Sequence, residues 1–152
     1  MKLTEHFTLA ELVASSTARK LGVDNTPTAD ALQQLHRTAQ MLERVRTFLG
    51  GKAVIVTSGY RNRQVNAAVG GVTSSDHAQG MAADVKIPGY GTPFEVAKAL
   101  APQISALGIG QIIYESVGGA QWVHLSTRIP LQAVNRVITV HGKTTMVGVQ
   151  QV

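Results

Sequence analysis

The hydrophobic residues in the first third of the chain recur with the spacing of an α-helix. Between residues 29 and 49 they lie three or four positions apart and form one apolar stripe, which predicts a long helix buried along one side. The stripe consists of Leu32, Leu35, Ala39, Leu42, Val45 and Leu49. Gly50 and Gly51 follow it and predict its end, because glycine readily adopts the left-handed conformation of a helix C-cap.

Three shorter helices are predicted from local patterns. The segment 8–15 begins with threonine and glutamate in the spacing of a capping box. The segment 92–107 begins with threonine, proline and a capping glutamate, and Pro102 predicts a kink or break within it. A short helical segment is expected to end at Asn66, before a glycine-containing loop over residues 69–74.

The second half of the chain has the short apolar runs of β-strands. A buried strand is predicted at 53–57, and a hairpin is predicted around the turn Gly118–Gly119. The further predicted strands are 81–87, 111–115, 122–126, 136–140 and 144–149. Helices come first and strands later, so we expect an α+β fold with a mainly antiparallel sheet flanked by helices. No repeat or linker divides the sequence, which predicts one domain over residues 1–152.

The composition narrows the chemistry. The chain contains no cysteine, so a metal site in it must use histidine, aspartate or glutamate. Its formal net charge of +5 favours acidic partners, but the basic residues are spread out, which argues against a nucleic-acid surface. No apolar run approaches the ~20 residues of a membrane span, so we expect no membrane insertion. Neither a Gly-x-Ser-x-Gly motif nor a P-loop is present.

Two histidines and one aspartate stand out as a metal-ligand set. His77 and Asp84 lie in the segment 75–84 (SDHAQGMAAD), and His124 lies in the segment 121–125 (QWVHL). Three protein ligands leave one position of a tetrahedral zinc ion open, which is typical of a catalytic site rather than a structural one. The sequence therefore predicts a zinc hydrolase.

The same segments resemble a known family. The pattern Ser-x-His-x-x-Gly-x-Ala-x-Asp, followed later by Trp-x-His, is similar to the zinc D-Ala-D-Ala carboxypeptidases and the peptidoglycan L-alanyl-D-glutamate endopeptidases, whose wider relatives include the hedgehog signalling domain. The likeness covers roughly residues 7–126 and is strongest to the compact phage and prophage branch. The further segments that contribute to it are 7–12, 21–27, 58–61, 66–71 and 112–115.

The resemblance implies roles for individual residues. His77, Asp84 and His124 would hold one zinc ion. Arg61 would bind a substrate carboxylate or polarise the scissile carbonyl, with a structural ion pair as the alternative. Ser75 would support the site or contact substrate, unless it only makes loop hydrogen bonds. For Trp122 we favour core packing over substrate stacking.

The chain departs from the family pattern at one position. Most relatives have a catalytic carboxylate three residues before the last histidine, where this chain has Gln121. If the predicted hairpin pairs Glu115 with Trp122, then Glu115 shares a face with His124. Glu115 is therefore the candidate general base and acid, and a carboxylate that only orients a ligand histidine is the alternative.

The resemblance also implies a substrate and a setting. The expected reaction is hydrolysis of an amide bond in the peptide part of peptidoglycan, either at the terminal D-Ala-D-Ala bond or within the stem. The alternative is a non-catalytic, zinc-stabilised wall-binding or virion structural module. Residues 1–6 lack the apolar core of a signal peptide. We therefore expect a protein made in the cytoplasm that reaches the wall after release, as an endolysin, or as part of a phage particle, with virion or tail association.

Overall fold

The computed structural model describes residues 1–72 and 75–152, and residues 73–74, which end the loop predicted over 69–74, lie outside the described part. The helices are α1 (Leu9–Val13), α2 (Ser16–Leu21), α3 (Ala29–Phe48), α4 (Arg63–Ala68) and α5 (Pro93–Leu100). Three short 3₁₀-helices are η1 (Asp76–Gln79), η2 (Ala101–Gln103) and η3 (Ala133–Arg136). The strands are β1 (Ile55–Ser58), β2 (Ala82–Lys86), β3 (Gln111–Val117), β4 (Ala120–Ser126), β5 (Val137–His141) and β6 (Thr144–Val147).

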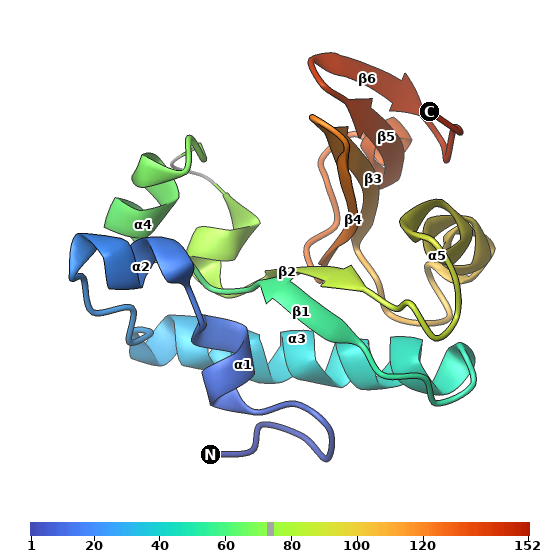
Figure 1. The fold of residues 1–152 in the computed structure, drawn as a ribbon. Helices are drawn as coiled ribbons and strands as arrows, with labels where there is room; N and C mark the ends of the chain where they lie inside the picture. The colour runs from blue at the N-terminus through green and yellow to red at the C-terminus, as the bar shows by residue number, and fades with distance from the viewer. Residues whose placement is uncertain (73–74) are drawn as a thin grey trace.

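The six strands form one mixed sheet in the order β1-β2-β4-β3-β5-β6. Every neighbouring pair is antiparallel except β3 and β5, so the predicted α+β class with a mainly antiparallel sheet is confirmed. The sheet twists strongly: β1 and β2 lie along α3, while β3 to β6 stand away from it (Figure 1). Helix α5 lies beside β3 and β4, and α1, α2 and α4 lie towards the other end of α3.

Helix α3 forms as its apolar spacing predicts. The side chain of Thr28 caps it by accepting a hydrogen bond from the N–H of Ala31, and Gly50 follows its end with a φ of +87°. The buried residues of α3 are Ala31, Leu35, Thr38, Ala39, Met41, Leu42 and Val45. Leu32, predicted to be buried, is only half-buried. The stripe therefore faces the sheet slightly rotated from its predicted centre.

Three other elements refine the predictions. Helix α5 ends at Leu100 and continues as a 3₁₀-turn through Pro102, which confirms the predicted break. Helix α2 was not predicted; Ser15 caps its start, and Gly22, with a φ of +66°, ends it. Strand β1 was predicted to be buried, and this is wrong: it is an edge strand with Ile55 49% exposed, because it pairs only with β2.

The alternation of side chains along β3 and β4 gives the sheet two distinct faces. On one face Tyr114, Val123 and Leu125 are at most 1% exposed, and the ring of Tyr114 packs against Phe94 of α5. These residues belong to the hydrophobic core, together with α3. The other face of the same strands presents His124 and Glu115, and we call it the site face.

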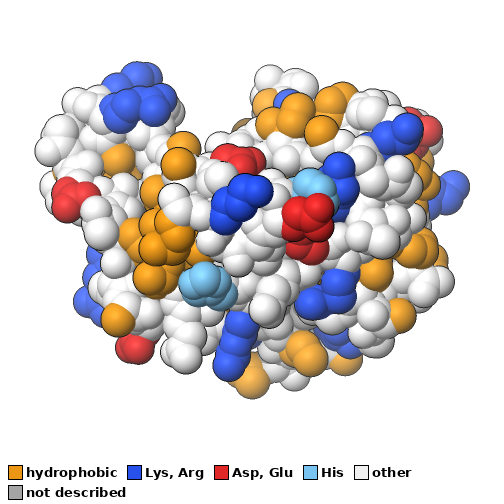
Figure 2. Space-filling model, turned by 90° about the horizontal axis from the view of Figure 1, so that it is seen from below, with side chains coloured by type: hydrophobic (Ala, Val, Ile, Leu, Met, Phe, Trp, Pro, Cys, Tyr) orange, Lys and Arg blue, Asp and Glu red, His pale blue; other side chains and the backbone are white. Residues whose placement is uncertain are grey.

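The side of the molecule formed by α3 has no single kind of surface. Figure 2, seen from below relative to Figure 1, shows Lys and Arg side chains interspersed with acidic, histidine and uncharged ones. Among the described residues, no helix has the length and apolarity that crossing a membrane requires.

Candidate metal centre

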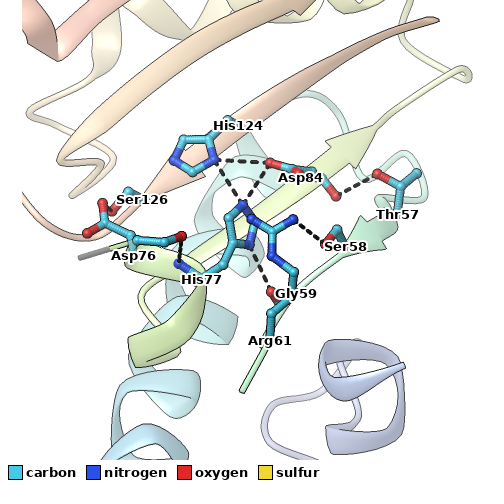
Figure 3. Close-up of polar contacts among 10 residues, drawn as sticks. Thr57, Ser58, Gly59, Arg61, Asp76, His77, Asp84, His124 and Ser126 are labelled. Atoms are coloured by element: carbon cyan, nitrogen blue, oxygen red, sulfur yellow. Dashed lines mark hydrogen bonds and ion pairs between the residues drawn. The ribbon is translucent and has the colours of Figure 1, made fainter. Parts of the chain in front are cut away.

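His77, Asp84 and His124 bring three ligand atoms together. His77 Nε2 lies 3.2 Å from Asp84 Oδ1 and 3.2 Å from His124 Nδ1, and the latter two atoms are 3.0 Å apart (Figure 3). Ligands held about 2.0–2.1 Å from a tetrahedral zinc ion lie roughly 3.3 Å from one another. The three atoms are thus spaced as the edges of one face of such a tetrahedron, and the group could hold a metal ion.

The three side chains meet because separate elements place them at one point. Strands β2 and β4 are antiparallel with Asp84 directly opposite His124, so both side chains lie on the site face. His77 comes from η1, which ends at Gly80 with a φ of +78°. A Cβ at Gly80 would lie 2.5 Å from the carbonyl oxygen of Ala31, so this turn against α3 requires glycine.

A backbone carbonyl orients the ring of His77. His77 Nδ1 lies 2.8 Å from the oxygen of Gly59. Because a carbonyl oxygen only accepts, Nδ1 carries the proton and donates it, which leaves Nε2 with a lone pair pointed at Asp84 and His124. Position 59 requires glycine, because a Cβ there would lie 2.3 Å from the carbonyl oxygen of Leu12 in α1.

The ligands perturb each other's ionisation. Burial works to raise the pKa of Asp84, but hydrogen bonds from His124 and His77 outweigh it and hold that pKa well below its ordinary value. Burial works to lower the pKa of His124, but the hydrogen bond and negative charge of Asp84 raise it above its ordinary value. In the metal-free protein this centre therefore holds an ionised carboxylate next to an imidazole that readily takes a proton, where a cation would replace that proton.

Comparison with known families agrees with this geometry. The family model described as Peptidase M15 matches residues 5–126. The chain belongs to the peptidase M15 family. No curated protein matches the chain. The family assigns the chain to the peptidases, and its match ends with β4, before η3, β5 and β6.

In this M15 peptidase, Arg61 lies beside the metal-ligand group (Figure 3). Among the described residues, the side chain of Arg61 makes one long hydrogen bond, from Nη1 to Ser58 Oγ at 3.5 Å, and its buried Nε has no partner. Burial lowers the pKa of Arg61, while the negative charges of Asp84 and Glu115 oppose the change. No ion pair holds Arg61 in the described part of the chain, so the structural alternative has no contact to support it.

Glu115 lies on the site face, because the hairpin has the register that could be stated only as a condition from sequence. Glu115 is directly opposite Trp122 in the β3–β4 pair, and Ile113 is opposite His124. Burial raises the pKa of Glu115 above its ordinary value, and the negative charge of Asp84 adds to the shift. A carboxyl group with a raised pKa beside a metal-ligand group is suited to accept and return a proton near neutral pH.

Gln121 lies on the other face of the sheet. It alternates with Trp122 and His124 along β4, and its Oε1 accepts a hydrogen bond of 2.8 Å from the hydroxyl of Tyr114. Gln121 therefore lies on the face of the sheet that carries Tyr114, and not on the site face.

Two predicted residues have roles that the structure makes more specific. Ser75 accepts a hydrogen bond from the N–H of His77 at 3.2 Å and so caps η1, which supports the site; contact with substrate stays a prediction. Trp122 was expected to pack in the core, and this is wrong: it is half-buried on the site face and lies outside the core cluster. The pairing of Trp122 with Glu115 explains the difference, because opposed residues share a face.

One group of positioning residues was missed from sequence. Asp76 Oδ2 accepts a hydrogen bond of 2.7 Å from Ser126 Oγ, and Asp76 Oδ1 pairs with Arg128 Nε at 2.8 Å. These contacts tie η1 to the end of β4 and so hold His77 near His124. The sequence could have placed Ser126 on the same face as His124, because residues two apart on a strand share a face.

Proposed function

We propose that this M15 peptidase is a zinc-dependent hydrolase that cleaves an amide bond in the peptide part of bacterial peptidoglycan. The observation that supports it most strongly is the set of ligand atoms from His77, Asp84 and His124, 3.0–3.2 Å apart, on the face that also presents Glu115. The donor set of two imidazoles and one carboxylate suits zinc. Zinc, when bound, would supply Lewis-acid catalysis by polarising the scissile carbonyl and acidifying water.

The residues around the ligands divide the remaining tasks. Gly59 keeps the proton of His77 on Nδ1, so Nε2 stays free to bind metal. Arg61 is half-buried, its Nε lacks a hydrogen-bond partner among the described residues, and its guanidinium is suited to bind a carboxylate of the substrate. Glu115, whose pKa burial raises, accepts a proton as the amide is attacked and returns it to the leaving amine.

Charge and family both support the proposed substrate class. The stem peptide of peptidoglycan carries free carboxylates, which are complementary to Arg61 and to the chain's formal charge of +5. Both cuts remain within the proposal: removal of the terminal D-alanine, or cleavage inside the stem. Gln121, whose departure from the family pattern favours the non-catalytic alternative, lies on the other face with Tyr114.

Mass spectrometry of peptidoglycan fragments after incubation with zinc-loaded protein tests the proposal. We expect a mass change that a chelator abolishes and that Asp84→Asn prevents. Loss of one alanine would identify a carboxypeptidase, and a split stem would identify an endopeptidase. Unchanged fragments from protein with bound zinc would contradict the proposal and favour a wall-binding or virion structural module.

A further inference from the structure

Two hollows lie along α3. They have volumes of about 660 Å³ and 430 Å³, and Gln34 and Met81 line both of them, so we treat them together as the α3 groove. Its charged lining residues are Asp30, Arg37, Arg44, Arg63 and Arg128. Arg128 is already paired with Asp76, and the remaining arginines outnumber Asp30 three to one, which favours an anionic ligand.

Two of these arginines are held in place by the protein. Arg44 Nε donates to the carbonyl oxygen of Leu107 at 2.7 Å, and Arg128 Nε pairs with Asp76 Oδ1 at 2.8 Å. Gly108 makes room for Arg44, because a Cβ at Gly108 would lie 2.7 Å from Arg44 Nη2. A guanidinium held through Nε loses less conformational freedom when its terminal nitrogens bind a carboxylate.

The groove and the metal-ligand group share one wall. Helix η1 contributes His77 to the ligand group, Ala78 and Gln79 to the groove, and Asp76 to the ion pair with Arg128. Helix η1 therefore connects the groove to the metal-ligand group. The amide side chains that line the groove are Gln33, Gln34, Gln40 and Gln79, and such groups both donate and accept hydrogen bonds.

We propose that the α3 groove binds a neighbouring, carboxylate-bearing strand of the same peptidoglycan whose peptide is cleaved at the metal centre. The polymer's identity rests on the proposed function. Carboxylates match the arginines, and amides and hydroxyls of the strand match the glutamines. The groove thereby holds the enzyme on the polymer, while the metal-ligand group acts on one peptide of it.

Co-sedimentation of the intact, metal-loaded chain with insoluble peptidoglycan tests this groove, using wall material stripped of phosphate polymers and short incubation in the cold. Arg37 is exposed on α3, and both glutamine and glutamate are good helix formers there. We expect Arg37→Gln to weaken binding by a factor of about two to five, as an exposed charge pair does. Arg37→Glu weakens it further, and added salt reduces wild-type binding towards that of the variants.

Lys143→Gln, in the exposed turn between β5 and β6, is the matched control, because it removes one positive charge away from the groove. Its binding should equal that of the wild type. Equal binding by Arg37→Glu and wild type would overturn the proposal, and so would binding that requires the phosphate polymers. Because binding is measured rather than product, a chain that binds through Arg37 without cleaving would refute the proposed function alone.

Discussion

The hydroxyl of Tyr114 donates a hydrogen bond of 2.8 Å to Gln121 Oε1, on the face of the sheet opposite to the metal ligands. The two residues lie on neighbouring strands, and Tyr114 is 1% exposed. The family resemblance predicts a carboxylate at the position of Gln121. In this chain Gln121 bonds Tyr114 on the core face, and the site face presents Glu115 in addition to the ligand Asp84.

Gln121→Ala is therefore expected to lower stability and leave turnover unchanged. The variant removes the acceptor of a largely buried hydroxyl, which costs about 1 kcal/mol or somewhat more. Tyr114→Phe, which removes the donor of the same bond, is the matched variant. Urea unfolding together with peptide hydrolysis measures both effects. A large loss of turnover in correctly folded Gln121→Ala would contradict this prediction and indicate that Gln121 takes part in catalysis.

Glu115→Gln should have the opposite pattern. The amide cannot accept a proton, so we expect turnover to fall by about 10²–10⁴-fold. Zinc content should stay at the wild-type level, because Glu115 is not among the three grouped ligand atoms. Glu5→Gln, at an exposed carboxylate near the N-terminus, provides the control for the loss of one negative charge. Wild-type turnover by Glu115→Gln with metal bound would remove Glu115 from proton transfer.

Much of the site could be predicted because a strand's alternation is fixed by its sequence. Once β4 was placed, His124 and Trp122 had to share a face. The register of the hairpin was open, and the structure shows that it pairs Glu115 with Trp122. The same alternation places Gln121 on the other face, so this too was available from sequence. The packing of Trp122 was misjudged because its apolar character was given more weight than its position.

Other features depend on contacts between distant segments, which local sequence patterns do not predict. The segment of β1 is as apolar as a buried strand, yet among the described residues it pairs with β2 alone and forms an edge of the sheet. The parallel pairing of β5 with β3 depends on the path of the chain after β4. The contact of Asp76 with Ser126 joins residues 50 positions apart, and no local sequence pattern predicts such a contact.

The affinity for zinc should fall as the pH is lowered. A metal ion requires His124 without its proton, and the pKa of His124 is raised above its ordinary value in the metal-free protein. Below that raised pKa one proton competes with the metal, so the apparent affinity drops about tenfold for each pH unit. The sequence alone predicts the loss below about pH 6 from ordinary histidines, and the raised pKa moves its onset to higher pH.

Titration against a competing chelator over a range of pH measures this dependence. His141→Gln, at an exposed histidine outside the ligand group, should leave the profile unchanged. A zinc affinity that stays constant from neutral pH to pH values below about 6 would contradict the assignment of neutral histidine ligands.

Gly59→Ala should weaken metal binding without touching a ligand. An added Cβ would lie 2.3 Å from the carbonyl oxygen of Leu12, so the backbone must move at a point where Tyr60 N–H also bonds that oxygen at 2.7 Å. Such crowding costs about 1–3 kcal/mol of stability. Movement of the Gly59 carbonyl would also disturb its hydrogen bond with His77 Nδ1.

We expect zinc affinity of Gly59→Ala to fall by about 10–100-fold, as for other losses of a contact that orients a ligand histidine. Gly89→Ala is the matched control, because a Cβ at Gly89 meets only the side chain of Lys52 at 3.5 Å or more. Metal titration under conditions where circular dichroism shows both variants folded separates affinity from stability. If folded Gly59→Ala binds zinc as tightly as Gly89→Ala, the carbonyl of Gly59 does not set the orientation of His77.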